Sequence, residues 1–301
     1  MGLMLMAEEV TFALHYPDTP DWATLELAPT WADELRLYTP RGLWRFLRAV
    51  FGAPQKVRVD TNQPLLGSIP RYALQEFHSL PNGNYSHKVS HGYITGFDIA
   101  MLGQVQKIRA LMALRVASCS SVLDLGTAGG KLAGTIKAQG VGDVWGVDVS
   151  PYLLKHAANN YPDVKFLHAA AENLPFTSER FDAVVVCFLF HEMPPKYIKQ
   201  ALRSCYRVLK PGGQLLVAEP SAKQLGKLRA ERFLSLVGYK HLYFKRLAGF
   251  VFEPFLDAWH KLDKPAVFAE AGFILNENDD RIPINYYALQ KPYSQNITGD
   301  L

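Results

Sequence analysis

The stretch that decides the fold reads SVLDLGTAGG over residues 121–130. It joins a short apolar run to an aspartate and a glycine-rich turn, directly before a helical pattern at 129–139. Glycines at the point where a strand turns into a helix allow a ligand to approach the backbone closely. The stretch therefore predicts the first strand and the ligand-binding turn of an α/β fold.

Beyond this turn, strand-like runs alternate with helix-length amphipathic stretches at 151–160 and 195–209. The strand-like runs are VWGVDV at 144–149, VKFLH at 164–168, FDAVVVCF at 181–188 and QLLVAE at 214–219. Such alternation predicts parallel strands joined by crossover helices.

Two aspartates indicate what the turn binds. Asp148 ends the second predicted strand, where it meets the same crevice as the glycine turn and can accept hydrogen bonds from both hydroxyls of a ribose. Asp124 lies inside the first strand. A carboxylate there attracts an ammonium group and repels a pyrophosphate, so it argues against a dinucleotide ligand.

These residues resemble the class I S-adenosylmethionine-dependent methyltransferases, in particular the small-molecule branch similar to ubiquinone/menaquinone C-methyltransferases. The resemblance covers roughly residues 95–290. It is also carried by AENLPF at 171–176, Phe181-Asp182, RVLKPGG at 207–213, Ala271-Gly272-Phe273 and INYYAL at 284–289. It implies a Rossmann-like α/β domain with a seven-stranded sheet of order 3-2-1-4-5-7-6, in which strand 7 is antiparallel.

The resemblance implies S-adenosylmethionine as the cofactor, S-adenosylhomocysteine as its product, and no metal. The residues expected to bind the cofactor are Asp124, Gly126, Thr127, Ala128, Gly130, Asp148, Val149, Ala171, Glu172 and Cys187. Two positions depart from the family. Ala128 stands where a glycine is common, which we expect to be sterically mild, and Ala170 stands where an acid often binds the adenine amine.

The carboxyl end of the fourth strand is expected to face the methyl group. His191 is the candidate general base there, because an unperturbed imidazole titrates at about 6.5, and a packing role is the alternative. The residues expected to contact the acceptor are Tyr85, His87, His91, Tyr93, Glu192, Tyr239 and Tyr243. The abundance of aromatic residues at 80–98 and 233–259 favours an apolar or aromatic acceptor.

The chain divides into two predicted parts. Residues 1–117 are expected to form a helical N-terminal extension and lid, with a loosely structured arm at 1–40 and an amphipathic helix at 41–52. A loop at 80–98 and a helical pattern at 99–116 complete it. Residues 118–301 are expected to form the cofactor-binding domain, with a substrate-recognition insertion at about 222–262.

The composition limits the partners. A net charge of +4, from 32 basic and 28 acidic residues without long runs of like charge, does not indicate nucleic-acid binding. Without a signal peptide or an apolar stretch of transmembrane length, a cytoplasmic protein is expected. The helix at 41–52 either docks on the protein body or contacts a membrane surface. The oligomeric state is open, a homodimer being among the states allowed.

The expected function is methyl transfer to oxygen or carbon of an apolar or aromatic small molecule. A methyltransferase acting on RNA or protein is the alternative if the helix at 41–52 and the basic residues at 240–246 form one groove. Ala128 and Ala170 motivate a third hypothesis, a protein that binds S-adenosylmethionine without methylating.

Overall fold

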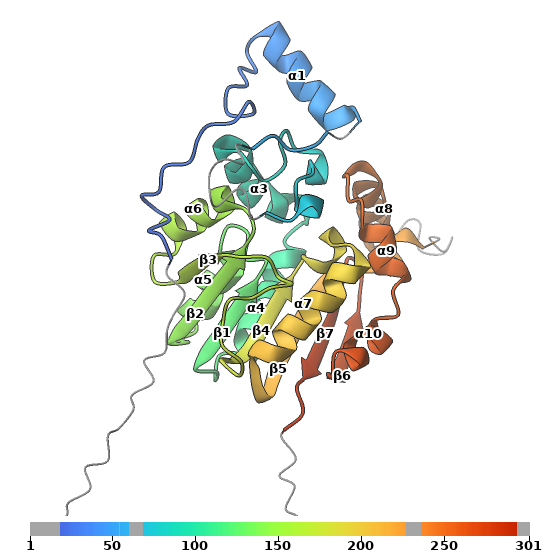
Figure 1. The fold of residues 1–301 in the computed structure, drawn as a ribbon. Helices are drawn as coiled ribbons and strands as arrows, with labels where there is room; N and C mark the ends of the chain where they lie inside the picture. Colours follow the sequence, from blue (N-terminus) through green and yellow to red (C-terminus); the bar gives the residue numbers. More distant parts are fainter. Residues whose placement is uncertain (1–18, 54, 60–68, 227–235, 294–301) are drawn as a thin grey trace, which may run out of the picture.

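The computed structural model describes residues 19–53, 55–59, 69–226 and 236–293 of the 301-residue chain. Its centre is a seven-stranded sheet in the order β3-β2-β1-β4-β5-β7-β6 (Figure 1). The strands are β1 (Ser121–Leu125), β2 (Asp143–Asp148), β3 (Lys165–His168), β4 (Phe181–Cys187), β5 (Leu209–Pro220), β6 (Ile274–Asp280) and β7 (Ile284–Gln290). The predicted strand order is confirmed. The first 18 residues of the expected arm lie outside the described residues.

The strand pairing brings the predicted site residues to one edge of the sheet. β1 pairs in parallel with β2 and β4, whereas β7 pairs antiparallel with β5 and β6, as expected. Leu125, the last residue of β1, lies beside Val147 of β2 and Val186 of β4. Asp148 and Cys187 therefore follow at the same edge as the glycine turn.

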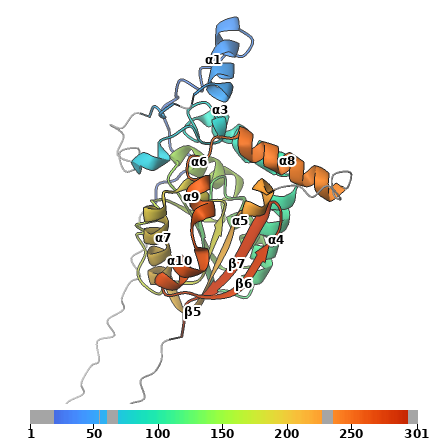
Figure 2. The ribbon, with the colours of Figure 1, turned by 90° about the vertical axis from the view of Figure 1, so that its right-hand side faces the viewer.

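Helices cover both faces of the sheet, because alternate strand residues point to opposite sides. Leu123 of β1 packs with α7, α9 and α10, and Val122 packs with α4, α5 and α6. Figure 2 shows these two layers on either side of the strands. The helices are α4 (Gln104–Arg115), α5 (Lys131–Ala138), α6 (Pro151–Asn160), α7 (Pro195–Val208), α9 (Leu256–Lys261) and α10 (Lys264–Glu270).

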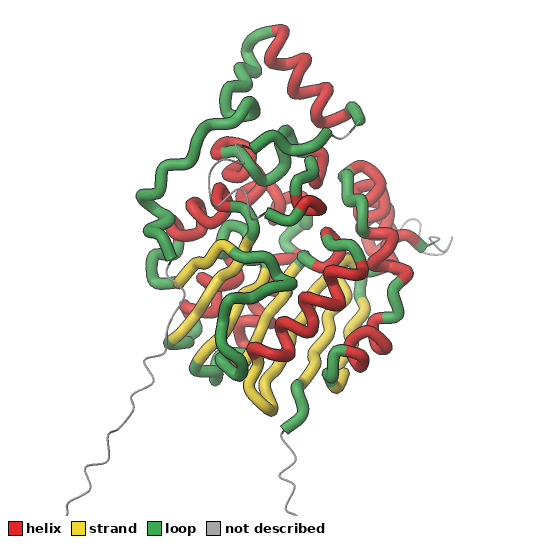
Figure 3. The backbone as a smooth tube through the Cα atoms, in the orientation of Figure 1, coloured by secondary structure: helices red, strands yellow, loops and turns green. Residues whose placement is uncertain are grey.

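The N-terminal extension lies over the carboxyl edge of the sheet (Figures 1 and 3). It contains α1 (Pro40–Phe51) and α3 (His87–Ala100), and α8 (Leu236–Phe250) lies beside it. The amphipathic helix expected at 41–52 is confirmed. Short 3-10 turns lie at Arg71–Ala73 (η1), Phe77–Ser79 (η2), Phe190–Glu192 (η3) and Ala222–Leu225 (η4). Among the described residues, no helix is long and apolar enough to cross a membrane.

Two expectations about the extension are wrong. The second half of the expected loop at 80–98 is helical, because the Ser86 side chain accepts a hydrogen bond from the Val89 amide at 3.2 Å and starts α3. The helical pattern at 99–116 is interrupted, because Leu102 and Gly103 adopt positive φ angles of 49° and 72°. α4 therefore begins only at Gln104.

The glycine turn closes tightly onto β2. The amides of Gly126 and Thr127 both donate to the carbonyl of Val147, at 2.8 and 2.9 Å. Gly126 has a φ of 73°, and Ala128 has a φ of 47°, in the left-handed region where a Cβ costs about 1–2 kcal/mol. The sequence-based expectation of a mild replacement at Ala128 missed this backbone cost.

We predict that Ala128→Gly stabilises the protein by up to about 1 kcal/mol, because the relief of left-handed strain exceeds the entropy that glycine adds to the unfolded chain. The measurement is the free energy of unfolding in urea. The matched control is Ala138→Gly at the exposed end of α5, which should lose about 1 kcal/mol. An equal loss in both variants would contradict the strain assigned to Ala128.

Candidate functional site

Three cavities meet at the carboxyl edge of the sheet. Two small ones, of about 80 and 60 Å³, flank the glycine turn, and a larger one of about 450 Å³ lies between α3 and α8. Tyr93 of α3 and Phe188, which follows β4, line all three. These two side chains therefore mark the junction of the cavities.

The cavity of about 80 Å³ is built around Asp148. Its Oδ2 accepts a hydrogen bond from the Ala128 amide and its Oδ1 accepts one from the Ser150 amide, both at 2.8 Å. Burial nevertheless raises the pKa of Asp148 to about 6. The carboxyl group is thus fixed by backbone on two sides, beside the wall formed by Val149 and Ala171.

The cavity of about 60 Å³ combines an acid with two cations. Asp124 is 2% exposed, and its Oδ2 accepts from the Thr127 hydroxyl at 2.7 Å and from the Ala133 amide at 3.0 Å. Burial raises the pKa of Asp124 to about 7. Arg109 and Lys131 line the same cavity. Such a set of charges suits an amino-acid group, which carries both an ammonium and a carboxylate.

The same two cations hold α3 in place. Arg109 of α4 and Lys131 of α5 both form ion pairs with Asp98 of α3, and the Lys131 Nζ lies 2.7 Å from the Asp98 Oδ2. Lys131 also donates to the carbonyl of Ile94 at 2.5 Å. α3, which covers the cavities, is therefore anchored to α5, the helix that follows the glycine turn.

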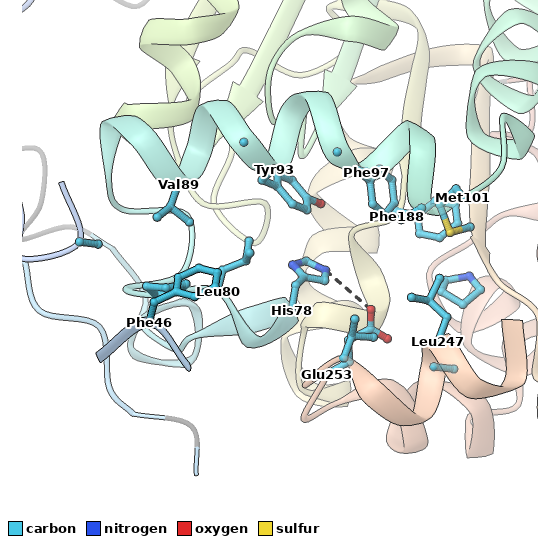
Figure 4. Close-up of a pocket in the computed structure, with 18 of the residues that line it drawn as sticks. Phe46, His78, Leu80, Val89, Tyr93, Phe97, Met101, Phe188, Leu247 and Glu253 are labelled. Carbon is cyan, nitrogen blue, oxygen red and sulfur yellow. Dashed lines mark ion pairs between the residues drawn. The ribbon is translucent and has the colours of Figure 1, made fainter. Parts of the chain in front are cut away.

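The large cavity is predominantly apolar (Figure 4). Its walls include Leu35, Phe46, Leu80, Phe97, Met101 and Leu247. The few polar side chains at its surface include His78 and Glu253, which Figure 4 shows facing one another. An apolar cavity with a few convergent polar groups suits a small apolar molecule bound in a fixed orientation.

A buried cluster of histidines and glutamates adjoins this cavity. His191 is 1% exposed, and its Nδ1 lies 2.6 Å from the Glu219 Oε2. Glu219 is held in turn by the amides of Leu189 and Phe190, at 2.9 and 2.7 Å. On the other side, the His78 Nε2 lies 3.1 Å from the Glu192 Oε1.

The charges in this cluster determine the protonation of His191. Burial alone would lower its pKa, but the carboxylates of Glu219 and Glu253 outweigh burial and raise the pKa well above its usual value. An imidazole that already holds a proton at neutral pH is a poor base by itself. Proton transfer therefore has to be considered for the whole cluster.

Most of the expected cofactor residues line the two small cavities. They are Asp124, Gly126, Thr127, Ala128, Asp148, Val149, Ala171 and Cys187. Gly130 and Glu172 line neither of them. A Cβ added to Gly130 would lie 3.0 Å from Ala157, and Glu172 accepts a hydrogen bond from the Tyr72 hydroxyl at 2.9 Å. These two residues therefore act through the packing and hydrogen bonding around the cavities rather than by lining them.

The expected acceptor contacts divide in a similar way. Tyr85, Tyr93 and Glu192 line the cavities. The other four expected residues, which line none of the three, are His87, His91, Tyr239 and Tyr243.

Each of these four is engaged elsewhere or exposed, so the cavities do not support their assignment as acceptor contacts, which stays a prediction. The His87 ring contacts the Leu27 carbonyl at 3.0 Å, and His91 packs on His156. Tyr239 is 59% exposed. The Tyr243 hydroxyl donates to the Ala100 carbonyl at 2.8 Å.

Sequence reasoning missed several groups that the fold brings to the cavities. Phe188 could have been found, since it directly follows a predicted strand whose carboxyl end faces the site. His78, Glu253 and Arg109 carry no local signal, because they come from a turn, a loop and a helix far apart in the chain. Only the packing of the folded chain brings these three side chains to the cavities.

Comparisons with known proteins agree with this architecture. Residues 122–213 match the sequence profile of a family described as a methyltransferase domain. A demethylmenaquinone methyltransferase of Renibacterium salmoninarum is 34% identical over 134 residues, which cover 44% of this chain and 55% of that protein. A ubiquinone/menaquinone biosynthesis C-methyltransferase of Bordetella avium is 32% identical over 158 residues, which cover 48% of this chain and 61% of that protein.

The chain spans about half the length of the curated relatives it matches. Among solved structures, human N-acetylserotonin methyltransferase in complex with S-adenosylmethionine superposes with a TM-score of 0.49 at 17% identity. That alignment covers 69% of this chain and 57% of the human one. At this level the likeness adds nothing to what the strand order already shows.

The strand order is that of the class I methyltransferase fold, and the profile match indicates a methyltransferase domain over residues 122–213. Within that class, the chain is similar to the methyltransferases of ubiquinone and menaquinone biosynthesis.

We predict that Asp148→Ala weakens the binding of S-adenosylhomocysteine by at least about 100-fold, since the hydrogen bonds expected from two ribose hydroxyls to this charged acceptor would be lost. Calorimetric titration measures the effect. The control is Asp143→Ala at the opposite end of β2, which should leave the affinity unchanged. Unchanged affinity in Asp148→Ala would refute the assigned site.

The same titration in wild-type protein should depend on pH. Because the pKa of Asp148 is raised to about 6, its carboxylate is ionised above this pH and gains a proton as the pH falls through it. Asp124, with a pKa of about 7, titrates in the same range. Affinity should therefore be full at about pH 8 and decline towards about pH 5 in wild-type protein as both carboxylates gain protons. A flat profile over this range would contradict the raised pKa.

Proposed function

We propose that the protein transfers a methyl group from S-adenosylmethionine to an apolar small molecule held in the cavity of about 450 Å³. The observation that carries this proposal is the junction at Tyr93 and Phe188, where the acceptor cavity meets both small cavities. The similarity to methyltransferases of ubiquinone and menaquinone biosynthesis favours a quinone-like acceptor, with carbon or oxygen as the methylated atom.

The residues of the two small cavities fit the proposed cofactor. Asp148 would accept the ribose hydroxyls, and the backbone of Ala171 would contact the adenine. Asp124 would face the ammonium group through Oδ1, since both of its hydrogen bonds described above end on Oδ2. Arg109 and Lys131 would meet the carboxylate. An ammonium beside Asp124 would favour its ionised form and oppose the effect of burial on its pKa.

When bound, the cofactor supplies a methyl group that is already activated on a sulfonium, so positioning provides much of the rate. Aromatic rings at the junction would favour a positive charge by cation–π contact. Tyr93 is held for this role, because it stacks on His78 with ring centroids 5.0 Å apart and packs on Phe97 at 5.5 Å.

The removal of a proton from the acceptor is assigned to the cluster rather than to His191 alone. Glu253 lines the acceptor cavity, and His191 lies behind it. Burial would raise the pKa of Glu253, but His191 and His78 outweigh burial and lower it, so that its carboxylate is ionised at neutral pH. His191 would then act through Glu253 as a positioning residue.

The alternative of an RNA or protein substrate receives less support. Such a substrate would need the basic residues of α1 and α8 to form one groove. The described contact between these helices is apolar, since Phe51 packs edge-on against Phe250 with centroids 5.7 Å apart. The non-methylating alternative rests on Ala128 and Ala170, and production of S-adenosylhomocysteine with a quinol acceptor would eliminate it.

We predict that Gly96→Leu lowers the rate of methylation of a quinol acceptor by at least about 10-fold and leaves the affinity for S-adenosylhomocysteine unchanged. Gly96 lines the acceptor cavity, and a Cβ added there meets no atom within 4 Å. Glycine inside a helix costs about 1 kcal/mol relative to alanine, so its presence in α3 suggests that space is needed.

The matched control is Gly96→Ala, which should stabilise α3 by about 0.5–1 kcal/mol and retain most activity. Steady-state kinetics and urea unfolding distinguish the two effects. Full activity in the leucine variant would show that the acceptor binds elsewhere.

We also propose that α1 contacts a membrane surface, from which an apolar acceptor can enter the cavity. Trp44 and Phe51 are 59% and 68% exposed, and Phe46 of the same helix lines the cavity. Apolar side chains beside Arg41 and Arg45 form the kind of helix that lies in an anionic lipid interface.

Wild-type protein should therefore cosediment with vesicles that contain phosphatidylglycerol, and Trp44→Glu should reduce the bound fraction about 10-fold or more. The control is Leu114→Glu. Leu114 is about as exposed as Trp44 but lies on α4, at the side of the sheet domain. Equal binding by all three proteins would contradict a role for α1.

A further inference from the structure

Three donor side chains converge at the wall of the acceptor cavity. His78 comes from η2, His191 from η3 and Glu253 from the segment after α8. One ligand atom from each of these residues lies within 4.8 Å of the others. Figure 4 shows the carboxylate of Glu253 directed at the His78 ring, on the side of α3 that carries Tyr93.

Two distances within this trio are slightly longer than those between ligands of one ion. The Glu253 Oε1 lies 3.6 Å from the His191 Nε2 and 3.7 Å from the His78 Nε2. Both are too long for hydrogen bonds, which end at about 3.2 Å. Nitrogen and oxygen atoms at about 2.1 Å from a shared zinc ion lie about 3.0–3.5 Å apart. A shift of a few tenths of an ångström would bring both contacts of Glu253 into this range, and the His78 Nε2 would exchange its contact with the Glu192 Oε1, at 3.1 Å, for the ion.

The His191 ring is oriented as a metal ligand would be. Its Nδ1 is bound to Glu219 at 2.6 Å, whereas its Nε2 is buried and makes no hydrogen bond within the part of the chain described. Metal-bound histidines commonly donate the other ring nitrogen to a carboxylate, which fixes the tautomer and the ring plane. The backbone amides of Leu189 and Phe190 fix Glu219 in the same way.

The charges of the cluster also suit a divalent cation. The carboxylates of Glu192, Glu219 and Glu253 surround two imidazoles, so a divalent cation bound there would be compensated by negative charge. A site with two imidazoles and one carboxylate suits a borderline ion such as Zn²⁺, Fe²⁺ or Co²⁺ better than Mg²⁺ or Ca²⁺, which prefer oxygen ligands.

We propose that His78, His191 and Glu253 form a site for a divalent metal ion of the zinc type, with an open coordination position at the acceptor cavity. Three protein ligands with a fourth position free are typical of catalytic rather than structural zinc sites. An acceptor oxygen at that position would be fixed beside Tyr93, and the ion would lower the pKa of a hydroxyl group there. With the ion bound, Glu253 would act as a ligand rather than as the proton acceptor. This role in acceptor binding rests on the proposed function, whereas metal binding itself does not.

The test is a titration of tag-free protein, freed of metal with a chelator, with Co²⁺ at neutral pH. We expect one equivalent to bind, with the visible absorption of a four- or five-coordinate ion, and Zn²⁺ to displace it. His191→Ala and Glu253→Gln should each weaken Co²⁺ binding by at least about 100-fold, and Glu219→Gln by about 10–100-fold through its effect on the His191 ring.

The matched control is His156→Ala, a half-buried histidine outside the cluster, which should bind Co²⁺ like the wild type. Binding of S-adenosylhomocysteine by every variant would show that the fold is intact. The proposal is overturned if the wild type binds no stoichiometric Co²⁺, or if His78→Ala, His191→Ala and Glu253→Gln all bind it unchanged. Since the readout is spectroscopic, it is independent of whether methyl transfer is observed.

Discussion

The closure of the glycine turn onto β2 is the constraint on which the site depends. The amides of Gly126 and Thr127 converge on the Val147 carbonyl, and the next amide, of Ala128, binds the Asp148 carboxylate. These three hydrogen bonds use the first donors of the turn to join β1 to the end of β2. They also fix Asp148, so that the same contacts shape the backbone and present the carboxylate.

Burial opposes the ionisation of two aspartates at the small cavities. The two aspartates at the small cavities have raised pKa values, about 7 for Asp124 and about 6 for Asp148, because both are withdrawn from water. Paired or hydrogen-bonded charges are tolerated in such places when a ligand completes them. The cluster around His191 follows the same logic, since its carboxylates and imidazoles compensate one another beside an apolar cavity.

α3 connects the parts of the site that different chain segments supply. Asp98 binds it to Arg109 of α4 and Lys131 of α5, and Tyr93 and Phe97 project from it into the cavities. Gly92 and Gly96 leave room on its cavity side. A single helix therefore covers the cofactor side, shapes the acceptor side and is held by the cations of the glycine-turn region.

The sequence by itself determined the strands, the position of the glycine turn, and Asp124 and Asp148, whereas the order of the strands was implied by the resemblance to a known family. Those features follow from local patterns, because apolar runs of strand length, a strand-to-helix glycine turn and an acid at a strand end each occupy a few adjacent residues. Gly130 and Glu172 show the limit of such patterns, since both lie in matching motifs and yet line neither small cavity.

Only the tertiary structure decided how α3 is formed and what lies around the acceptor. The Ser86 cap overrode the glycines that suggested a loop, and packing left His87, His91, Tyr239 and Tyr243 outside the lining of the three cavities. The trio of His78, His191 and Glu253 comes from three distant segments without a shared motif. Its existence depends on long-range packing, which short-range sequence patterns do not encode.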